Sequence, residues 1–154
     1  MATVSAPTPL AVLVARLHER LGTPEAELHA AGGSFNLSQT LQHCAQTVRY
    51  SVTGYPQLKS ALFRVTVGAL AKRVFLRRGA TKHSLDAGLD GAPALDPELP
   101  ASEAARQFAD AVALFGAHTG PHPSHPAYGR CTHDEFERLH AMHLAEHLPG
   151  LVAV

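Results

Sequence analysis

The chain has 154 residues, 45% of them hydrophobic, and a formal net charge of zero with histidine counted as neutral, which suits one folded domain over residues 1–154. The balanced charge gives no reason to expect nucleic acid or a membrane surface as a partner. A basic, apolar leader and an apolar run of about 18 residues are both missing, and the two cysteines form no disulfide framework, so we expect a cytoplasmic protein that is neither secreted nor membrane-spanning.

Two helices are predicted in the N-terminal region, residues 1–33. Thr8 can cap the first helix and Pro9 suits its first turn, after which apolar residues recur at helical spacing up to Gly22. A second Thr-Pro start and a Gly-Gly end predict a short extra helix in residues 23–33.

Two longer helices are predicted next, in residues 36–54 and 56–79. Asn36 followed by Gln39 is a variant of the capping box, which predicts where the first of them begins. The second ends in two arginines and Gly79, the usual C-terminal signature, although its β-branched residues would also suit a strand.

A connection rich in glycine and proline, residues 79–101, is too long for a tight hairpin and predicts a crossover over one end of a bundle. A helix in residues 102–120 and a loop in residues 121–131 follow. Thr132 and Glu135 form a capping box that opens the last helix. The predicted fold is all-α: a four-helix bundle with a long crossover loop and a short extra helix.

Three of the eleven histidines, His140, His143 and His147, fall within this last helix. At about 100° per residue they occupy the middle of its apolar stripe, so a solvated histidine face is a poor explanation. The opposite side of the helix carries Arg138, Met142 and Glu146.

Buried imidazoles need partners, because an unpaired buried polar group costs about 1–3 kcal/mol. His143 and His147 lie four residues apart, as in helical zinc sites, and we predict that they bind a metal ion together. Hydrogen-bonded core histidines are the alternative. His140 could be a further ligand, but we favour a hydrogen bond to the site or plain packing.

A third ligand has to come from another helix, and His43 is the best candidate. It lies away from the apolar face of the predicted helix 36–54, beside Gln39 and Tyr50 on a polar face with almost no charge. Uncharged amides and a phenol suit the wall of a small wet pocket, so we predict that Gln39 and Tyr50 line it. A surface helix that is merely rich in Gln and Thr is the alternative.

The remaining histidines and charges give weaker signals. His118, His122 and His125 could bind a metal loosely, but we expect them to be exposed in their loop. Residues 28–85 carry eight Lys or Arg and no acid, whereas residues 86–154 carry ten acids and three Arg. Such segregation could steer an anionic ligand or pair two subunits of a homodimer, or it could balance helices within one fold.

Four segments carry a resemblance to a known family: "NLSQTLQHCAQTVRYSVTGYP", "FRVTVGALAKRVFLRRG", "GAPAL" and "HPAYGRCTHDEFERLHAMHLAEHL". Within residues 34–150 the chain resembles the DinB/YfiT-like superfamily, and most of all a branch catalogued as a domain of unknown function. The resemblance implies a helical bundle with a divalent metal ion held by His43, His143 and His147. It implies no role for His140.

Low-molecular-weight-thiol transferases belong to this superfamily, as do members with no assigned reaction. The resulting hypothesis is a metal-dependent hydrolase or thiol transferase acting on a small-molecule substrate, with zinc expected and nickel or iron as alternatives. Three neutral imidazoles would leave the ion's charge to favour hydroxide, thiolate or carboxylate at an open position. A non-catalytic helical module that binds a metal or a small ligand is the alternative. A fourth protein ligand, from His125, His133 or His140, would indicate a structural site.

Overall fold

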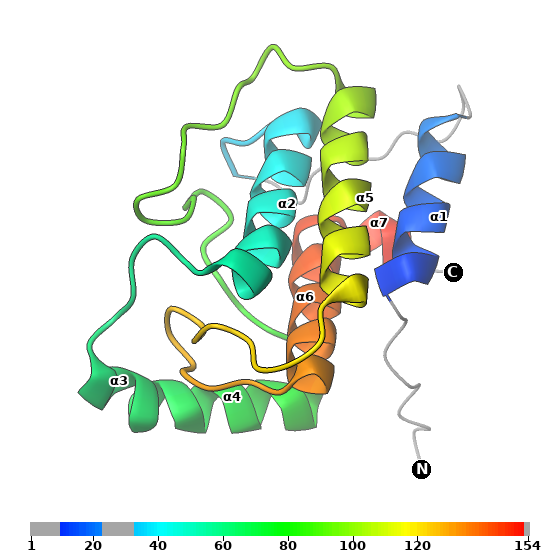
Figure 1. Ribbon diagram of the computed structural model, residues 1–154. Helices are drawn as coiled ribbons and strands as arrows, with labels where there is room; N and C mark the ends of the chain where they lie inside the picture. Colours follow the sequence, from blue (N-terminus) through cyan, green and yellow to red (C-terminus); the bar gives the residue numbers. More distant parts are fainter. Residues whose placement is uncertain (1–9, 23–32, 153–154) are drawn as a thin grey trace.

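All the secondary-structure elements that the computed structural model describes are helices (Figure 1). The described residues are 10–22 and 33–152. The predicted all-α class is confirmed for this part of the chain, and none of its helices is both long and apolar enough to cross a membrane. The helices are α1 (Leu10–Leu21), α2 (Leu37–Thr53), α3 (Ala61–Val65), α4 (Val67–Arg78), α5 (Ala101–Ala117), α6 (His133–His147) and α7 (Pro149–Val152).

The predicted capping residues set the helix ends. Asn36 and Gln39 form a reciprocal capping box at the start of α2, and Thr132 and Glu135 form another at the start of α6. Gly79 ends α4 in the left-handed conformation, with φ of 69°. The Thr8 cap, Pro9 and most of the short helix predicted in residues 23–33 lie outside the described residues.

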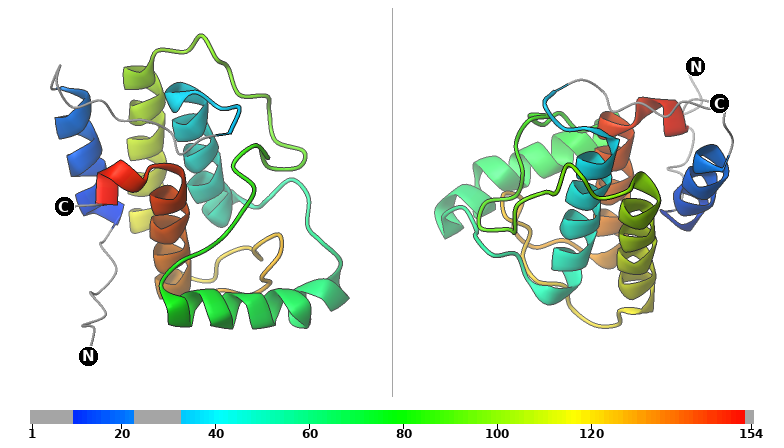
Figure 2. Two further views of the ribbon diagram at one scale, coloured as in Figure 1. Left: turned by 180° about the vertical axis from the view of Figure 1, so that it is seen from behind. Right: turned by 90° about the horizontal axis from the view of Figure 1, so that it is seen from above.

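Helices α1, α2, α5 and α6 pack against one another around one apolar core, and α7 contacts both α6 and α1 (Figure 2). The faces that meet are those whose apolar residues recur at helical spacing, so burial of these stripes drives the assembly. The fully buried side chains of this core include Leu13, Leu17, Leu41, Val48, Phe108, Phe136 and Leu144.

The continuous helix predicted in residues 56–79 is wrong in two respects. Helix α3 begins only after Ser60, whose hydroxyl accepts a hydrogen bond from the backbone N–H of Phe63. Thr66, with φ of −112° and ψ of −94°, then separates α3 from α4. Helix α4 crosses the end of α6 instead of joining the bundle side by side (Figure 1).

Gly68 allows α4 to approach the backbone of the loop before α6 very closely. It is the one buried residue of α4, and an added Cβ there would lie 1.7 Å from the carbonyl oxygen of Ala127. The opposite side, here called the outer face of α3–α4, is apolar yet exposed. Its residues Leu62, Val65, Val67, Leu70 and Val74 are 41–72% exposed.

The crossover between α4 and α5 runs along the polar face of α2 and not only over one end of the bundle (Figure 1). The Gln42 side chain donates to the carbonyl oxygen of Asp96 at 2.7 Å and accepts from the Asp96 N–H at 3.0 Å. Gln46 donates to the carbonyl oxygen of Pro93 at 3.0 Å. The amide-rich face of α2 therefore binds the backbone of the crossover.

Candidate metal centre and adjoining cavity

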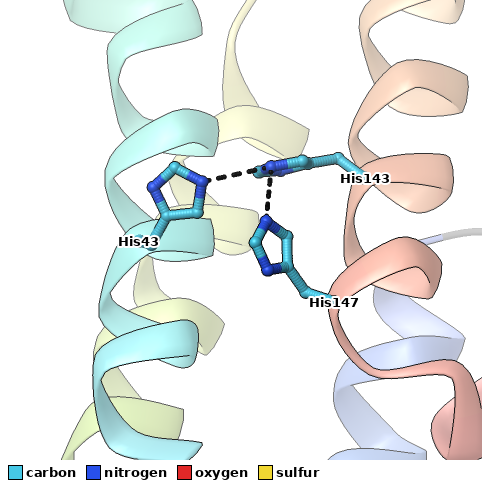
Figure 3. Close-up of side chains that lie close together, drawn as sticks. All are labelled: His43, His143 and His147. Carbon is cyan, nitrogen blue, oxygen red and sulfur yellow. Dashed lines mark hydrogen bonds between the residues drawn. The ribbon is translucent and has the colours of Figure 1, made fainter. Parts of the chain in front are cut away.

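Three imidazoles from two helices meet inside the bundle (Figure 3). His43 comes from α2, and His143 and His147 come from successive turns of α6. The Nε2 atom of His143 lies 3.2 Å from Nε2 of His43 and 3.1 Å from Nε2 of His147. The side chains of His43 and His147 are only 4% and 2% exposed. We call these three residues the metal cluster.

Hydrogen bonds among the three imidazoles cannot pair all the nitrogens that face one another in the metal cluster. A neutral imidazole has one N–H, so Nε2 of His143 can share one proton with one neighbour at a time, and another close pair is left with facing lone pairs. Burial lowers the pKa of His43 to about 4, with further lowering by His147 and His83. Burial also lowers the pKa of His143 and of His147, so extra protons do not fill the gap near neutral pH.

The donor set fits a divalent cation. Tetrahedral zinc with nitrogens at about 2.0–2.1 Å implies ligand nitrogens roughly 3.3 Å apart, close to the 3.1 and 3.2 Å found here. Nδ1 of His43 is buried without a hydrogen-bond partner in the described chain, so this imidazole is held by packing and by the nitrogens that it faces. In residues 10–22 and 33–152, no further His, Cys, Asp or Glu completes this group.

The histidines that could have closed the site do not join the metal cluster, and one ring nitrogen of each is bonded elsewhere. Nε2 of His140 pairs with Oγ of Ser51 at 3.0 Å, and Nδ1 of His133 pairs with Nε2 of His122 at 2.9 Å. Nδ1 of His125 accepts from two backbone N–H groups at 3.1 Å. The cluster therefore has three protein ligands available and an open side.

A cavity of about 210 Å³ adjoins this open side, and His43 and His143 form part of its wall. Its other walls come from the crossover, including Thr81 and Leu89, and from the loop before α6, including Tyr128. The volume lies below the roughly 300–1,000 Å³ of typical ligand pockets, so the cavity suits a small molecule.

His83 is a cavity residue that the sequence did not reveal. Its Nδ1 lies 2.9 Å from a carboxylate oxygen of Glu146, and its Nε2 lies 2.9 Å from the hydroxyl of Tyr128. The carboxylate can only accept, so Nδ1 donates, and in the neutral ring Nε2 accepts from the tyrosine hydroxyl. This fixes the ring of His83, whose centroid lies 5.4 Å from that of His143. No periodic signal marks a histidine in an irregular crossover.

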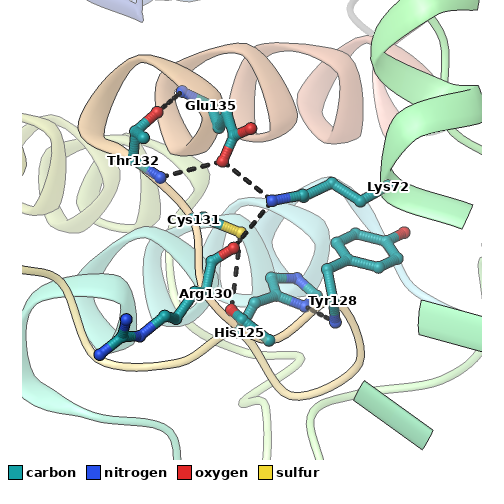
Figure 4. Close-up of polar contacts among 8 residues, drawn as sticks. Lys72, His125, Tyr128, Arg130, Cys131, Thr132 and Glu135 are labelled. Atoms are coloured by element: carbon teal, nitrogen blue, oxygen red, sulfur yellow. Dashed lines mark hydrogen bonds and ion pairs between the residues drawn. The ribbon is translucent and has the colours of Figure 1, made fainter. Parts of the chain in front are cut away.

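The side of α6 that faces away from the metal cluster is covered as well. Arg138 donates to the carbonyl oxygen of Leu76 at 2.7 Å, and Met142 packs with Leu139 and Tyr128. Lys72 of α4 joins the carbonyl oxygen of Arg130 to Glu135 at the start of α6 (Figure 4). Helix α4 and its neighbouring loop thus hold this side of α6.

Two residues predicted to line the pocket lie elsewhere. The Gln39 side chain accepts from the backbone N–H of Asn36 at 3.1 Å as part of the capping box. Tyr50 lies with its ring 6.0 Å from that of Tyr55, and neither it nor Gln39 is among the cavity residues. The uncharged residue of this face that does reach the cavity is Thr47, whose hydroxyl donates to the carbonyl oxygen of His43.

The expectation that His118, His122 and His125 are exposed is wrong, because all three are half-buried. The ring of His122 lies 4.5 Å from that of His118 and 5.1 Å from that of His133, and we call these three residues the second histidine group. The rings of His122 and His133 stack on Phe115 at 5.3 and 4.3 Å. The loop folds back over the bundle, which a local pattern of polar residues could not reveal.

Comparison with known proteins adds a family. A family model described as "Protein of unknown function (DUF1569)" matches residues 14–153 of the chain. No curated protein and no solved structure matches it significantly. Because the match spans most of the sequence, the chain belongs to the DUF1569 family.

Proposed function

We propose that this protein is a divalent-metal-dependent enzyme of the DinB-like type that acts on a small molecule, as a hydrolase or a low-molecular-weight-thiol transferase. One observation carries the proposal: three imidazoles converge at the wall of a cavity, and within the described residues no fourth His, Cys, Asp or Glu lies close enough to complete the group. A structural site would use a fourth protein ligand, whereas a catalytic site keeps a position for substrate.

Imidazole nitrogens suit zinc, nickel and iron alike, and we expect zinc because the spacing of the nitrogens is close to that of a tetrahedral zinc site. A bound divalent ion would supply positive charge that polarises a carbonyl group or lowers the pKa of a water or thiol. The imidazoles of His43, His143 and His147 would hold it. Being neutral, they would leave its charge available to the substrate.

The residues around the metal cluster would orient the substrate and shield it from bulk water. His83 is held by Glu146 and Tyr128, which fixes its ring over the metal cluster. Leu89 and Tyr128 give the cavity apolar walls that exclude bulk water, which strengthens electrostatic interactions inside it.

The first test is elemental analysis of purified, dialysed protein, combined with anomalous diffraction at the zinc, nickel and iron edges. We expect one ion per chain, coordinated by Nε2 of His43, His143 and His147, with at least one non-protein ligand facing the cavity. A metal-free protein that refuses zinc, or an ion bound elsewhere, would overturn the proposal.

Turnover separates an enzyme from a binding module. Metal-loaded protein is assayed against small esters and amides, and against small thiols paired with electrophiles, with metal-stripped protein as the matched control. We expect turnover only in the loaded form. Stoichiometric metal without turnover across the panel would favour the non-catalytic module instead.

A further inference from the structure

His125 presents a fixed hydrogen-bond donor to the cavity. Its Nδ1 accepts from the backbone N–H groups of Ala127 and Tyr128, both at 3.1 Å. Figure 4 shows the contact with Tyr128. An accepting Nδ1 leaves the proton of the neutral ring on Nε2. That Nε2–H has no hydrogen-bond partner in the described chain, and His125 lines the cavity. The turn at residues 125–129 therefore holds His125 in the Nε2–H tautomer.

His140 presents the complementary acceptor. The Ser51 hydroxyl gives its proton to the carbonyl oxygen of Val48 at 2.6 Å. Its oxygen can then only accept from Nε2 of His140, which lies 3.0 Å away. Nδ1 of His140 consequently keeps its lone pair and has no partner within the described residues. His140 is 3% exposed and is also a cavity residue.

Both rings stay neutral over the physiological range. Burial lowers the pKa of His125 to about 3 and that of His140 to about 3. The two flank Phe136, with ring centroids 6.1 and 5.5 Å from it. A donor and an acceptor, each fixed by the protein, therefore both belong to the lining of the cavity.

The cavity offers no charged partner. None of the described residues that line it is Asp, Glu, Lys or Arg. Away from the metal cluster, an anionic group would lose its hydration without a cation to replace it, and a cationic group would lack a carboxylate. The lining therefore favours a ligand whose bound end is polar but neutral.

We propose that His125 and His140 bind the neutral polar end of the substrate, His125 by donating one hydrogen bond and His140 by accepting one, so that the substrate carries a carboxamide or hydroxyl group. This names the substrate class of the enzyme inferred above and rests on that proposed function. The Nε2–H of His125 donates to the oxygen of this group. Nδ1 of His140 accepts the proton of its N–H or O–H.

Two substitutions separate recognition from folding. Asn at position 125 keeps an acceptor near the place of Nδ1 for the backbone turn but removes the Nε2–H. Gln at position 140 keeps a donor for Ser51 but removes the Nδ1 lone pair. His125→Asn and His140→Gln therefore each delete one cavity contact. His118→Gln changes a histidine outside the cavity and is the matched control.

The probes are butyramide and butyrate, titrated into zinc-loaded protein and followed by NMR chemical shifts. We expect His125→Asn and His140→Gln each to weaken butyramide binding about fivefold, the loss of one net hydrogen bond, and His118→Gln to leave it unchanged. Binding of butyrate, which can only reach the metal as an anion, should not respond to either substitution. Unchanged butyramide affinity in both cavity variants would overturn the inference.

Long-range ¹H–¹⁵N spectra provide a readout that needs neither metal nor turnover. We expect both His125 and His140 in the Nε2–H form between pH 6 and pH 8, the range in which the proposal applies. A Nδ1–H form at either residue would overturn the inference even in a metal-loaded, active protein. Conversely, the expected tautomers and amide binding in a protein without metal would defeat only the proposed enzyme.

Discussion

Two groups of three histidines lie at opposite ends of α6, and they differ in what their nitrogens face. In the second histidine group, His118 donates to the carbonyl oxygen of Pro121, and His122 donates to that of Ser51 and accepts from His133. In the metal cluster the Nε2 atoms face only one another. Proximity of histidines is therefore not in itself evidence for a metal site. The evidence is that the protein provides no hydrogen-bond donors for nitrogen lone pairs that face one another.

Removal of a metal ligand should distinguish the two histidine groups most clearly, because only one group is expected to bind metal. His143→Ala or His147→Ala removes one of three donors, and we expect zinc affinity to fall more than about 100-fold, beyond the loss seen when a residue that supports a ligand is changed. His122→Ala removes a paired histidine and should leave one ion per chain. Metal content after dialysis measures both. Wild-type metal in His147→Ala would refute the assignment.

Stabilisation by zinc should also differ between variants of the two histidine groups. Zinc at about 100 times its dissociation constant should raise the free energy of unfolding of the wild-type protein by about 2.7 kcal/mol. Denaturant titration with zinc or with a chelator measures this increment. We expect His122→Ala to keep it and His147→Ala to lose it. An equal increment in both variants would mean that the ion binds elsewhere.

The second histidine group should contribute to stability without metal. His122→Ala loses two hydrogen bonds and the ring contact with Phe115. We expect a loss of about 1–2 kcal/mol in the free energy of unfolding, measured with a chelator present. An unchanged free energy of unfolding would show that the second histidine group does not contribute to stability.

The pH dependence of stability tests the buried, neutral His140 that lies between the two groups. Its pKa is lowered to about 3 by burial, so below pH 6.5 the unfolded chain binds a proton that the folded chain does not. Stability is therefore lost as the pH falls from 6.5 towards 3. His140→Gln should flatten the slope by about 1.4 kcal/mol per pH unit, measured by urea unfolding of metal-free protein. Identical slopes would contradict a buried neutral ring.

Helix ends and the face of His43 could be predicted because their signals are local. Asn36 with Gln39, and Thr132 with Glu135, act within one turn. The polar face of α2 carries uncharged residues because it meets the crossover and the cavity instead of water, and this made His43 a candidate.

Other features depend on contacts between distant segments, which local sequence patterns do not predict. His83 and His125 reach the cavity from irregular segments whose positions are set by Glu146 and by the turn after residue 125. Gln39 has the composition of a pocket residue, but its capping bond holds it at the helix end. The break at Thr66 likewise goes with the close approach of Gly68 to Ala127, which helical periodicity cannot register.

Gly68 also has a practical consequence. Because α4 meets the loop before α6 backbone to backbone at this point, the spacing between helix and loop does not depend on the side chains of the outer face. Leu62 and Leu70, which are 72% and 64% exposed, are therefore positions where a fluorophore or spin label could be attached. Such a label would be carried by α3 or α4 and would leave the residues that line the cavity unchanged.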